Sequence, residues 1–461
     1  MVVFKYPPYF TSMTYIKKHG LFLLLLFPFF ANGQNHLYNS LQFGVRNAML
    51  GGAVTAGTDD PTMTYYNPAA IHLASSQLDI SLLQPQVSNF GFDRFWQKGE
   101  TSEINRDVGL EPSLISFKVR INKVDLAFLK IGKSEWMDFF NAKREATNVN
   151  LLKTQFFEYE YSGRDSWFGV GTSVKLNSYL SVGISQFFSL ARFRYRNNIL
   201  VETINVNAPP NRPVRHFNSD INSNYSNFSL LTNIGLLVDT KVHDIGIRIT
   251  TPAFLRLRQG GAYNRITSNI SLNQNTAEQL IDPDVSPTIK TPWEFHLGYS
   301  LVISPGRKIW LNGSYHSAIE EYEMAKIESA AGDVSWKNGS NAVVNFGISY
   351  SDQLTPNMEL SCGIRSNYFA YENRAPSAGS TRNVIFDGDH FHLVLGTKFK
   401  FKNNTVLFGL DWGRLVESSD TEGFRLLTDV GRLEPDLEGL TKGRLGVLLT
   451  YGFVIDSFRN K

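Results

Sequence analysis

The stretch SLISFKVRINKVDLAFLKI, residues 113–131, decides the fold class. Hydrophobic residues alternate with small or charged ones on both sides of Asn122-Lys123, which is the pattern of two strands joined by a tight turn. Phe117, for example, is followed by Lys118 on the opposite face. Each strand therefore has one hydrophobic face and one small or charged face.

The same alternation recurs from residue 77 to the end of the chain. A soluble sandwich also alternates, so the lengths of the connections decide between a sandwich and a barrel. Outer-membrane barrels carry tight turns at one rim and long loops at the other. Here short and long connections alternate strictly: 122–123, 177–178, 239–243, 304–307, 351–357 and 402–404 are short, whereas 85–112, 132–163, 197–224, 258–291, 321–340, 371–387 and 417–441 are long and polar.

Counting the alternating segments gives fourteen strands between residues 77 and 455. An even number is the rule for bacterial barrels, and it places both chain ends at the rim that carries the tight turns. The sequence therefore predicts an all-β fold, a fourteen-stranded antiparallel transmembrane β-barrel. Residues 456–461 are left as a short C-terminal tail.

Residues 1–33 read as a secretory signal peptide. The basic residues Lys17 and Lys18 precede an apolar run, Leu21 to Phe30, that is too short to span a bilayer. We expect cleavage near Gly33, before Gln34, and export to the outer membrane of a Gram-negative bacterium. Met1 and Met13 both remain possible initiators.

Composition excludes several classes of protein. The chain has 461 residues, a formal net charge of +3 and a single cysteine, Cys362. One cysteine permits neither an intramolecular disulfide nor a cysteine-based zinc site, and the small charge points to no nucleic-acid partner. Aromatic residues make up 13% of the chain, which suits the aromatic girdles of a membrane barrel. We expect no cofactor.

Residues 34–76 lie between the signal peptide and the first strand. The segment is rich in glycine and mixed in polarity, with neither a helical nor a strand period. A barrel of fourteen strands has room in its lumen for more than side chains. We therefore expect residues 34–76 to fold back into the lumen as a hatch that plugs it.

Residues 44–71, GVRNAMLGGAVTAGTDDPTMTYYNPAAI, resemble the N-terminal hatch of the FadL/TodX outer-membrane transport family. The resemblance implies a fourteen-stranded barrel, plugged by the hatch, that carries long-chain fatty acids or other hydrophobic compounds across the outer membrane. Some relatives of that family serve protein secretion or surface attachment instead. The matching hatch residues are Gly51, Gly52, Asp59, Asp60, Asn67, Pro68 and Ala69.

Two groups of apolar residues are candidate ligand contacts. The hatch group either lines an apolar pocket or forms the hatch's own small core. A second group lies in the long segment 132–163, where the spacing predicts a short amphipathic helix that either captures ligand outside the cell or packs against lipid and other loops. The two groups are Met49, Leu50, Met63, Tyr65 and Tyr66 in the hatch, and Trp136, Phe139 and Phe140 in the long segment.

Charged residues on the strands have two interpretations. Arg120, Arg248 and Arg365 either bind a ligand carboxylate or pair with the hatch acids Asp59 and Asp60. For an enzyme there is little support. No serine lies in a Gly-x-Ser-x-Gly elbow, so we expect no catalysis.

A metal site is equally unsupported. His390 and His392 share a strand face but lack a third ligand at useful spacing. We therefore expect no bound metal.

The sequence thus predicts a transporter of hydrophobic small molecules. Apolar loops would take a ligand from the lipopolysaccharide layer, a pocket above the hatch would hold it, and a hatch rearrangement would release it. The expected partners are membrane lipid, lipopolysaccharide, the ligand and the barrel assembly machinery. The alternative is a secretion or surface-attachment component with secreted protein partners, in which the barrel is a docking platform. An apolar pocket favours transport, and a filled polar lumen favours docking.

Overall fold

The computed structural model describes most of the chain. The predicted signal peptide and C-terminal tail lie outside the described residues, so the structure says nothing of either prediction. The described residues are 37–38, 40–81, 84–94, 103–111, 114–121, 124–148, 151–205, 215–240, 242–271, 274–285, 287–327, 334–371, 380–381, 385–418 and 438–454.

Strands make up most of the described chain, and two short helices precede them. The helices are α2 (Met63–Tyr66) and the 3-10 helix η1 (Pro68–Leu73). The strands are β1 (Gln77–Ser81), β2 (Gln84–Arg94), β3 (Glu103–Glu111), β4 (Leu114–Ile121), β5 (Val124–Asn148), β6 (Leu151–Lys175), β7 (Leu180–Asn205), β8 (Arg215–Asp239), β9 (His243–Thr250), β10 (Phe254–Ser271), β11 (Gln274–Val285), β12 (Glu294–Ser304), β13 (Arg307–His316), β14 (Ile319–Ile327), β15 (Val334–Ser340), β16 (Val343–Thr355), β17 (Met358–Asn367), β18 (Ser380–Thr381), β19 (Gly388–Phe401), β20 (Asn404–Ser418) and β21 (Glu438–Val454).

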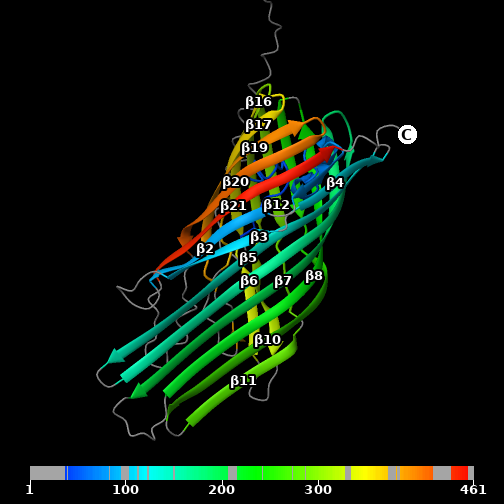
Figure 1. Ribbon diagram of the computed structural model, residues 1–461. Coiled ribbons are helices and arrows are strands. Elements are labelled where there is room, and N and C mark those ends of the chain that lie inside the picture. The colour runs from blue at the N-terminus through cyan, green and yellow to red at the C-terminus, as the bar shows by residue number, and fades with distance from the viewer. Residues whose placement is uncertain are drawn as a thin grey trace, which may run out of the picture.

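The strands close into an antiparallel barrel (Figure 1). Closure occurs where β1 pairs with β21, with Gln77 opposite Val454, so the barrel begins and ends at one rim. Several wall strands are built from two successive pieces that share a neighbour: β9 and β10, for example, both pair with β8. Joined in this way, the eighteen strands of the main sheet make fourteen wall strands, as the sequence predicts, while β14, β15 and β18 form a separate small sheet.

The hydrophobic faces of the strands point away from the interior. Leu297 and Phe408 are 56% and 53% exposed, whereas Arg248 and Asn233 on the inner face are 1% and 0% exposed. A water-soluble protein would bury the first pair and expose the second. This inverted pattern is that of a transmembrane barrel, whose outer belt contacts lipid. Among the described residues, no helix is long and apolar enough to cross a membrane.

The predicted tight turns are confirmed at one rim, which we call the turn rim. Gly306 between β12 and β13 has a φ of +82°, a conformation that glycine adopts without strain. The predicted long loops at the opposite rim are largely wrong. Strands β5, β6 and β8 have 25 residues each and β7 has 26, so the wall continues well beyond the 9–11 residues that span a bilayer.

The predicted amphipathic helix is also wrong, because its residues belong to strand β5. Trp136, Phe139 and Phe140 pair with Gly163, Glu160 and Tyr159 of β6. Residues 138, 140 and 142 are buried and alternate with more exposed neighbours, so the segment also carries a two-residue period. Continuous pairing with β6 gives its backbone hydrogen bonds that an isolated short helix at a rim would lack.

The N-terminal segment, residues 40–76, lies inside the barrel near the turn rim. Helix η1 contacts β6, β7 and β8. Together with the wall, the segment builds a hydrophobic cluster that we call the floor cluster. Its members include Leu41, Phe43, Leu50, Val54, Met63, Tyr65, Tyr66, Trp167, Phe187, Leu231 and Trp310.

A second hydrophobic cluster, the roof cluster, fills the interior further along the same strands. On β6, Trp167 belongs to the floor cluster and Phe157 to the roof cluster. The roof cluster also includes residues from the connection between β17 and β19, which was predicted as a polar loop. Its members are Phe90, Phe92, Phe140, Ala142, Phe157, Tyr159, Tyr161, Tyr195, Ile199, Val201, Tyr371, Ile385 and Phe386.

Candidate functional site

A cavity of about 650 Å³ separates the floor cluster from the roof cluster. Trp167 and Leu231 of the floor cluster line one side of it, and Phe90, Tyr161 and Ile385 of the roof cluster line the other. Its size is within the range of pockets that hold small molecules, roughly 300–1,000 Å³. The cavity is therefore the candidate ligand site.

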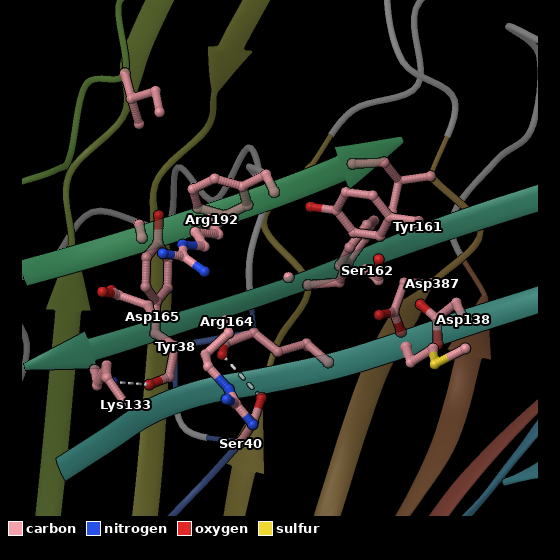
Figure 2. A pocket seen from close by; sticks show the side chains of 18 of the residues that line it. Tyr38, Ser40, Lys133, Asp138, Tyr161, Ser162, Arg164, Asp165, Arg192 and Asp387 are labelled. Atoms are coloured by element: carbon pink, nitrogen blue, oxygen red, sulfur yellow. Dashed lines mark hydrogen bonds between the residues drawn. The ribbon is translucent and has the colours of Figure 1, made fainter. Parts of the chain in front are cut away.

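One end of the cavity is formed by the start of the N-terminal segment. Tyr38 lines the cavity, its ring stacks on His316 with centroids 4.0 Å apart, and its carbonyl oxygen accepts a hydrogen bond from Lys133 Nζ at 2.8 Å. Lys133 also lies over the ring of Tyr65, 5.3 Å from its centroid. Figure 2 shows the Lys133–Tyr38 contact. This end of the site combines aromatic faces with one ammonium group.

Asp165 adds a carboxylate on the wall beside Tyr38 (Figure 2). It accepts hydrogen bonds from Trp167 Nε1 and from the Ser189 hydroxyl, both at 2.7 Å. Trp167 lies on the same strand as Asp165, β6, and Ser189 lies on the neighbouring strand β7. The lining is thus mixed rather than purely apolar.

The opposite end of the cavity holds a compact charge network. Lys442 Nζ lies 2.7 Å from Asp138 Oδ2 and 2.6 Å from Asp387 Oδ2. His390 Nε2 lies 2.8 Å from Asp387 Oδ1. Figure 2 shows Asp138 and Asp387 close together at this end.

The floor beneath the cavity is seated on glycines of the wall, which we call the glycine belt. At each position a Cβ atom would press against residues 49–69. At Gly298 it would lie 2.5 Å from the amide nitrogen of Ala56, and at Gly396 it would lie 2.8 Å from Met49 Cγ. The segment therefore packs on the wall at backbone distance. The belt comprises Gly183, Gly235, Gly246, Gly298, Gly363 and Gly396 on β7, β8, β9, β12, β17 and β19.

Wall side chains also hydrogen-bond to backbone carbonyl groups of the segment. Arg248 Nη1 donates to the carbonyl oxygen of Tyr65 at 2.8 Å, and Arg365 Nη2 donates to that of Ser40 at 3.1 Å. Lys118 donates to the carbonyl oxygen of Ala74. These bonds satisfy carbonyl groups of the segment, among them that of Tyr65 in the last turn of α2.

The predicted pairing of the wall arginines with the hatch acids is wrong. Arg248 pairs with Glu294 at 2.9 Å and Arg365 with Asp411 at 2.8 Å, both on the wall. Neighbouring strands place Glu294 and Asp411 beside these arginines. The wall acids therefore neutralise the arginine charges, and Asp59 and Asp60 are not needed for that. Arg120 is exposed at the end of β4.

The hatch acids have partners closer in sequence. Asp59 lies 2.9 Å from Arg46, and Asp60 accepts from the backbone of Arg46 and the hydroxyl of Thr62. Burial raises the pKa of Asp60. Burial acts the same way on Asp59, but Arg46 and Lys398 outweigh it and hold its pKa below the usual range. The two adjacent acids therefore stabilise the segment's own turns.

The structure places the other predicted hatch residues in tight turns and in η1. Gly51 and Gly52 have φ of +56° and +74°, in the left-handed region that favours glycine. Asn67 caps η1: its side-chain oxygen accepts from the amide of Ala69, while Pro68 occupies the first helical turn. The motif is therefore a structural corner of the segment.

None of the predicted ligand contacts is among the described residues that line the cavity. Met49, Leu50, Met63, Tyr65 and Tyr66 are at most 7% exposed and pack within the segment or against the wall. This placement matches the alternative that they form a core. In the second group, Phe140 lies in the roof cluster, Phe139 is partly exposed on β5, and only the backbone of Trp136 is described.

The histidine pair is engaged with carboxylates rather than arranged around a metal. His390 contacts Asp387, and His392 Nδ1 lies 3.1 Å from Asp411 Oδ1. Within the described residues, no group of three or more His, Cys, Asp or Glu side chains is placed to hold a metal ion.

The sequence reasoning missed the glycine belt and the cavity lining. A signal for the belt was present, since glycine inside a strand often marks a close approach of another backbone. Gly246, Gly298 and Gly396 all lie on the inward face of alternating strands. Lys133 gave no such signal, because an irregularity in the β5–β6 register falls between Gly132 and Ser134.

Comparisons with known proteins support the fold. No protein-family model matches the chain, and no curated protein matches it. Among solved structures, the Ralstonia pickettii toluene transporter TbuX is 12% identical, with 91% of this chain and 100% of TbuX covered at a TM-score of 0.56. A Pseudomonas aeruginosa FadL homologue is 10% identical, with coverages of 92% and 100% and a TM-score of 0.54.

The P. putida toluene transporter TodX is similar to the same degree, 10% identical over 90% of this chain and 99% of TodX at a TM-score of 0.57. At these identities the likeness shows the architecture and not the cargo. The chain therefore has the FadL-type fold, a closed fourteen-stranded antiparallel transmembrane β-barrel.

Proposed function

We propose that the protein is an outer-membrane transporter of hydrophobic small molecules, with long-chain fatty acids as one candidate cargo. The observation that carries the proposal is the cavity of about 650 Å³ between the floor and roof clusters. The solved structures of this fold include two described as toluene transporters, which supports the same class of activity here. The proposal assigns the protein no catalytic step.

In this proposal the N-terminal segment acts as a hatch beneath the bound ligand. Two features support that role: the segment is buried against the glycine belt, and wall side chains hold its carbonyl groups. A ligand above it is separated from the turn rim by packed protein. Release toward that rim requires the segment to rearrange.

The mixed lining bears on the type of cargo and on the docking alternative. A docking platform would favour a filled polar lumen, whereas the described residues leave a cavity with aromatic walls. The apolar contacts come from Phe90, Trp167 and Leu231, and the polar ones from Lys133 and Asp165. A molecule with an apolar body and a polar group therefore fits this lining better than a pure hydrocarbon does, because the polar lining residues would otherwise be left without a partner.

The test fills the cavity from one wall residue. Ala191 on β7 is 6% exposed and lines the cavity, whereas its neighbour Leu190 is 46% exposed on the outer face. Ala191→Trp should reduce two quantities by about tenfold, because the pocket volume is lost. The first is the amount of co-purifying lipid, measured by extraction and mass spectrometry. The second is the uptake of a fluorescent fatty acid. Leu190→Trp is the matched control and should change neither. Wild-type protein without any extractable hydrophobic ligand or uptake would overturn the proposal.

A further inference from the structure

The roof of the cavity contains a short piece of chain that is not part of the wall. Residues Ile385–Asp387 precede strand β19 and are at most 5% exposed. Ile385 and Asp387 line the cavity directly. We call residues 385–387 the roof segment.

Aromatic packing holds the centre of the roof segment. The ring of Phe386 lies 4.8 Å from that of Tyr159 and 5.2 Å from that of Phe92, both in edge-on arrangements. Tyr159 and Phe92 come from wall strands β6 and β2. Contacts of this kind add only modestly to the stabilisation from area burial, so they hold the segment without locking it.

Charges hold the end of the roof segment. Lys442 of β21 bridges Asp387 of the roof segment and Asp138 of β5, with both contacts below 2.8 Å. Asp387 also accepts from the amide of Gly388 at 2.9 Å and lies 2.8 Å from His390 Nε2. Burial raises the pKa of Asp387, but Lys442 and His390 outweigh it and lower that pKa to about 2, so the carboxylate stays charged.

Lys442 and Asp387 each have a second partner in this network. If the Lys442–Asp387 contact breaks, Lys442 still faces Asp138, and Asp387 still faces His390 and the amide of Gly388. Separating a buried ion pair is costly mainly because it leaves an uncompensated charge. Here neither charge is left without a partner, so this contact is cheaper to break than an isolated pair.

The floor of the cavity is held differently. The glycine belt leaves no gap between the N-terminal segment and the wall, and the wall donors bind single carbonyl groups. Moving the floor means separating two backbones that touch along the whole belt, whereas the roof segment is only three residues long.

We propose that residues Ile385–Asp387 form a displaceable roof over the cavity and that Lys442 is its latch, which exchanges Asp387 for Asp138 alone when a ligand enters. The inference rests on the proposed function, in which the cavity is the ligand site. It places ligand entry at the rim opposite the turn rim. It also makes Lys442 a gating residue rather than a ligand contact.

The experiment measures how easily a reagent reaches the cavity. Ala191→Cys in a Cys362→Ala background places one thiol on the cavity wall, and a water-soluble maleimide is added to the purified barrel in detergent. Lys442→Met leaves Asp138 and Asp387 facing each other without the ammonium group. We expect labelling to accelerate by about tenfold or more, because breaking a buried ion pair is strongly destabilising.

The matched control removes the same charge at the floor. Lys398 lies 3.0 Å from Glu359 and 3.9 Å from Asp59, so Lys398→Met breaks an equivalent bridge near the turn rim. Labelling should stay at the wild-type rate in that variant. An equal acceleration in both variants, or none in Lys442→Met, overturns the latch.

A second variant protects the test against misfolding. If Lys442→Met loses its heat-modifiable band, Asp387→Asn keeps the shape of the side chain and removes only its charge. Faster labelling in Asp387→Asn supports the latch, and an unchanged rate overturns it. The lipid extraction described above is separate: its failure removes the proposed function, whereas the labelling result decides the roof alone.

Discussion

Asn67 joins the N-terminal segment to itself and to the wall through one amide group. Its Nδ2 donates to the carbonyl oxygen of Thr55 at 2.8 Å and to that of Leu236 on β8 at 3.1 Å. Its side-chain oxygen caps helix η1 by accepting from Ala69 at 3.1 Å. A buried residue with three such bonds fixes where the segment turns toward the first wall strand.

We predict that Asn67→Ala loosens the segment and leaves the barrel folded. Losing a buried hydrogen-bonding group costs about 1–3 kcal/mol, and the barrel's own ladder does not depend on it. The measurement is leakage of a small solute from liposomes, with heat-modifiability as the folding check. Asn177→Ala removes an exposed cap that accepts from Tyr179 and Leu180, so it should not leak. Equal leakage in both variants would contradict the prediction.

The glycine belt gives a second prediction. A Cβ at Gly246 would overlap the carbonyl oxygen of Thr55, whereas nothing lies within 4 Å of a Cβ at Gly313. Gly246→Ala should therefore displace residues 53–57 and raise their protease sensitivity, with an overpacking cost of about 1–3 kcal/mol. Gly313→Ala should behave like wild type in limited proteolysis. If Gly246→Ala is as resistant to protease as wild type, the packing of residues 53–57 on the glycine belt tolerates a methyl group.

The outer belt gives a third prediction. Leu297 is 56% exposed at mid-wall, so Leu297→Arg should destabilise the barrel in lipid by about 2–4 kcal/mol in urea titrations. Asn141 is exposed on the part of β5 beyond the belt, and Asn141→Arg should change little. If Leu297→Arg is neutral, the belt does not face lipid.

The roof latch should respond to acid. The pKa of Asp387 is about 2 in the folded protein against an ordinary value of 3.8. A carboxyl group with a lowered pKa stabilises the closed roof above its ordinary pKa, and that stabilisation is lost as the pH falls through about 4 toward 2. Lys442 and His390 contact Asp387, and Asp138 shares Lys442 with it.

Conductance in planar bilayers measures this acid response. It should rise below about pH 4, where the ordinary carboxyl group is protonated. Lys442→Met, which lacks the latch, should show no such step. A step centred near pH 6 would point to Asp138, whose pKa burial raises to about 6, instead of Asp387.

Sidedness is the fifth prediction. Lys143 on β5 is 61% exposed beyond the belt, and Asn177 lies in a turn of the turn rim. In a Cys362→Ala background, Lys143→Cys should react with an impermeant maleimide on whole cells and Asn177→Cys should not. The reverse result would invert the topology and place the roof in the periplasm.

The wall strands could be predicted from sequence because their alternation depends only on residues that are close together in the chain. Alternation along residues 113–131 depends on neighbouring residues, and the structure confirms it for the paired strands Leu114–Ile121 and Val124–Asn148. The extent of the strands could not be predicted, since beyond the belt both faces of β5 and β6 carry polar residues and the hydrophobic alternation fades, although burial still alternates. Pairing with the next strand then decides, as it does at Phe140.

The cavity could not be predicted for a related reason. Tyr38, Lys133 and Asp387 lie far apart in sequence, and only closure of the barrel brings them to one space. Apolar residues of the segment, such as Met49 and Tyr66, looked like pocket residues. Instead, Met49 packs on Gly396 of the glycine belt, and the Tyr66 hydroxyl hydrogen-bonds to Phe43 and Gln42 within the segment. These partners could not be identified without the strand order.

The glycine belt also bears on the order in which the chain assembles. Its glycines lie on strands from β7 to β19, so the complete belt exists only after most of the wall has formed. Residues 40–76 are the first part of the wall-bound chain to be synthesised and, on this geometry, the last to acquire a partner. During biogenesis they must stay extended and uncommitted while the sheet grows beside them. The apolar residues that finally pack as the floor are then the ones most exposed to periplasmic chaperones.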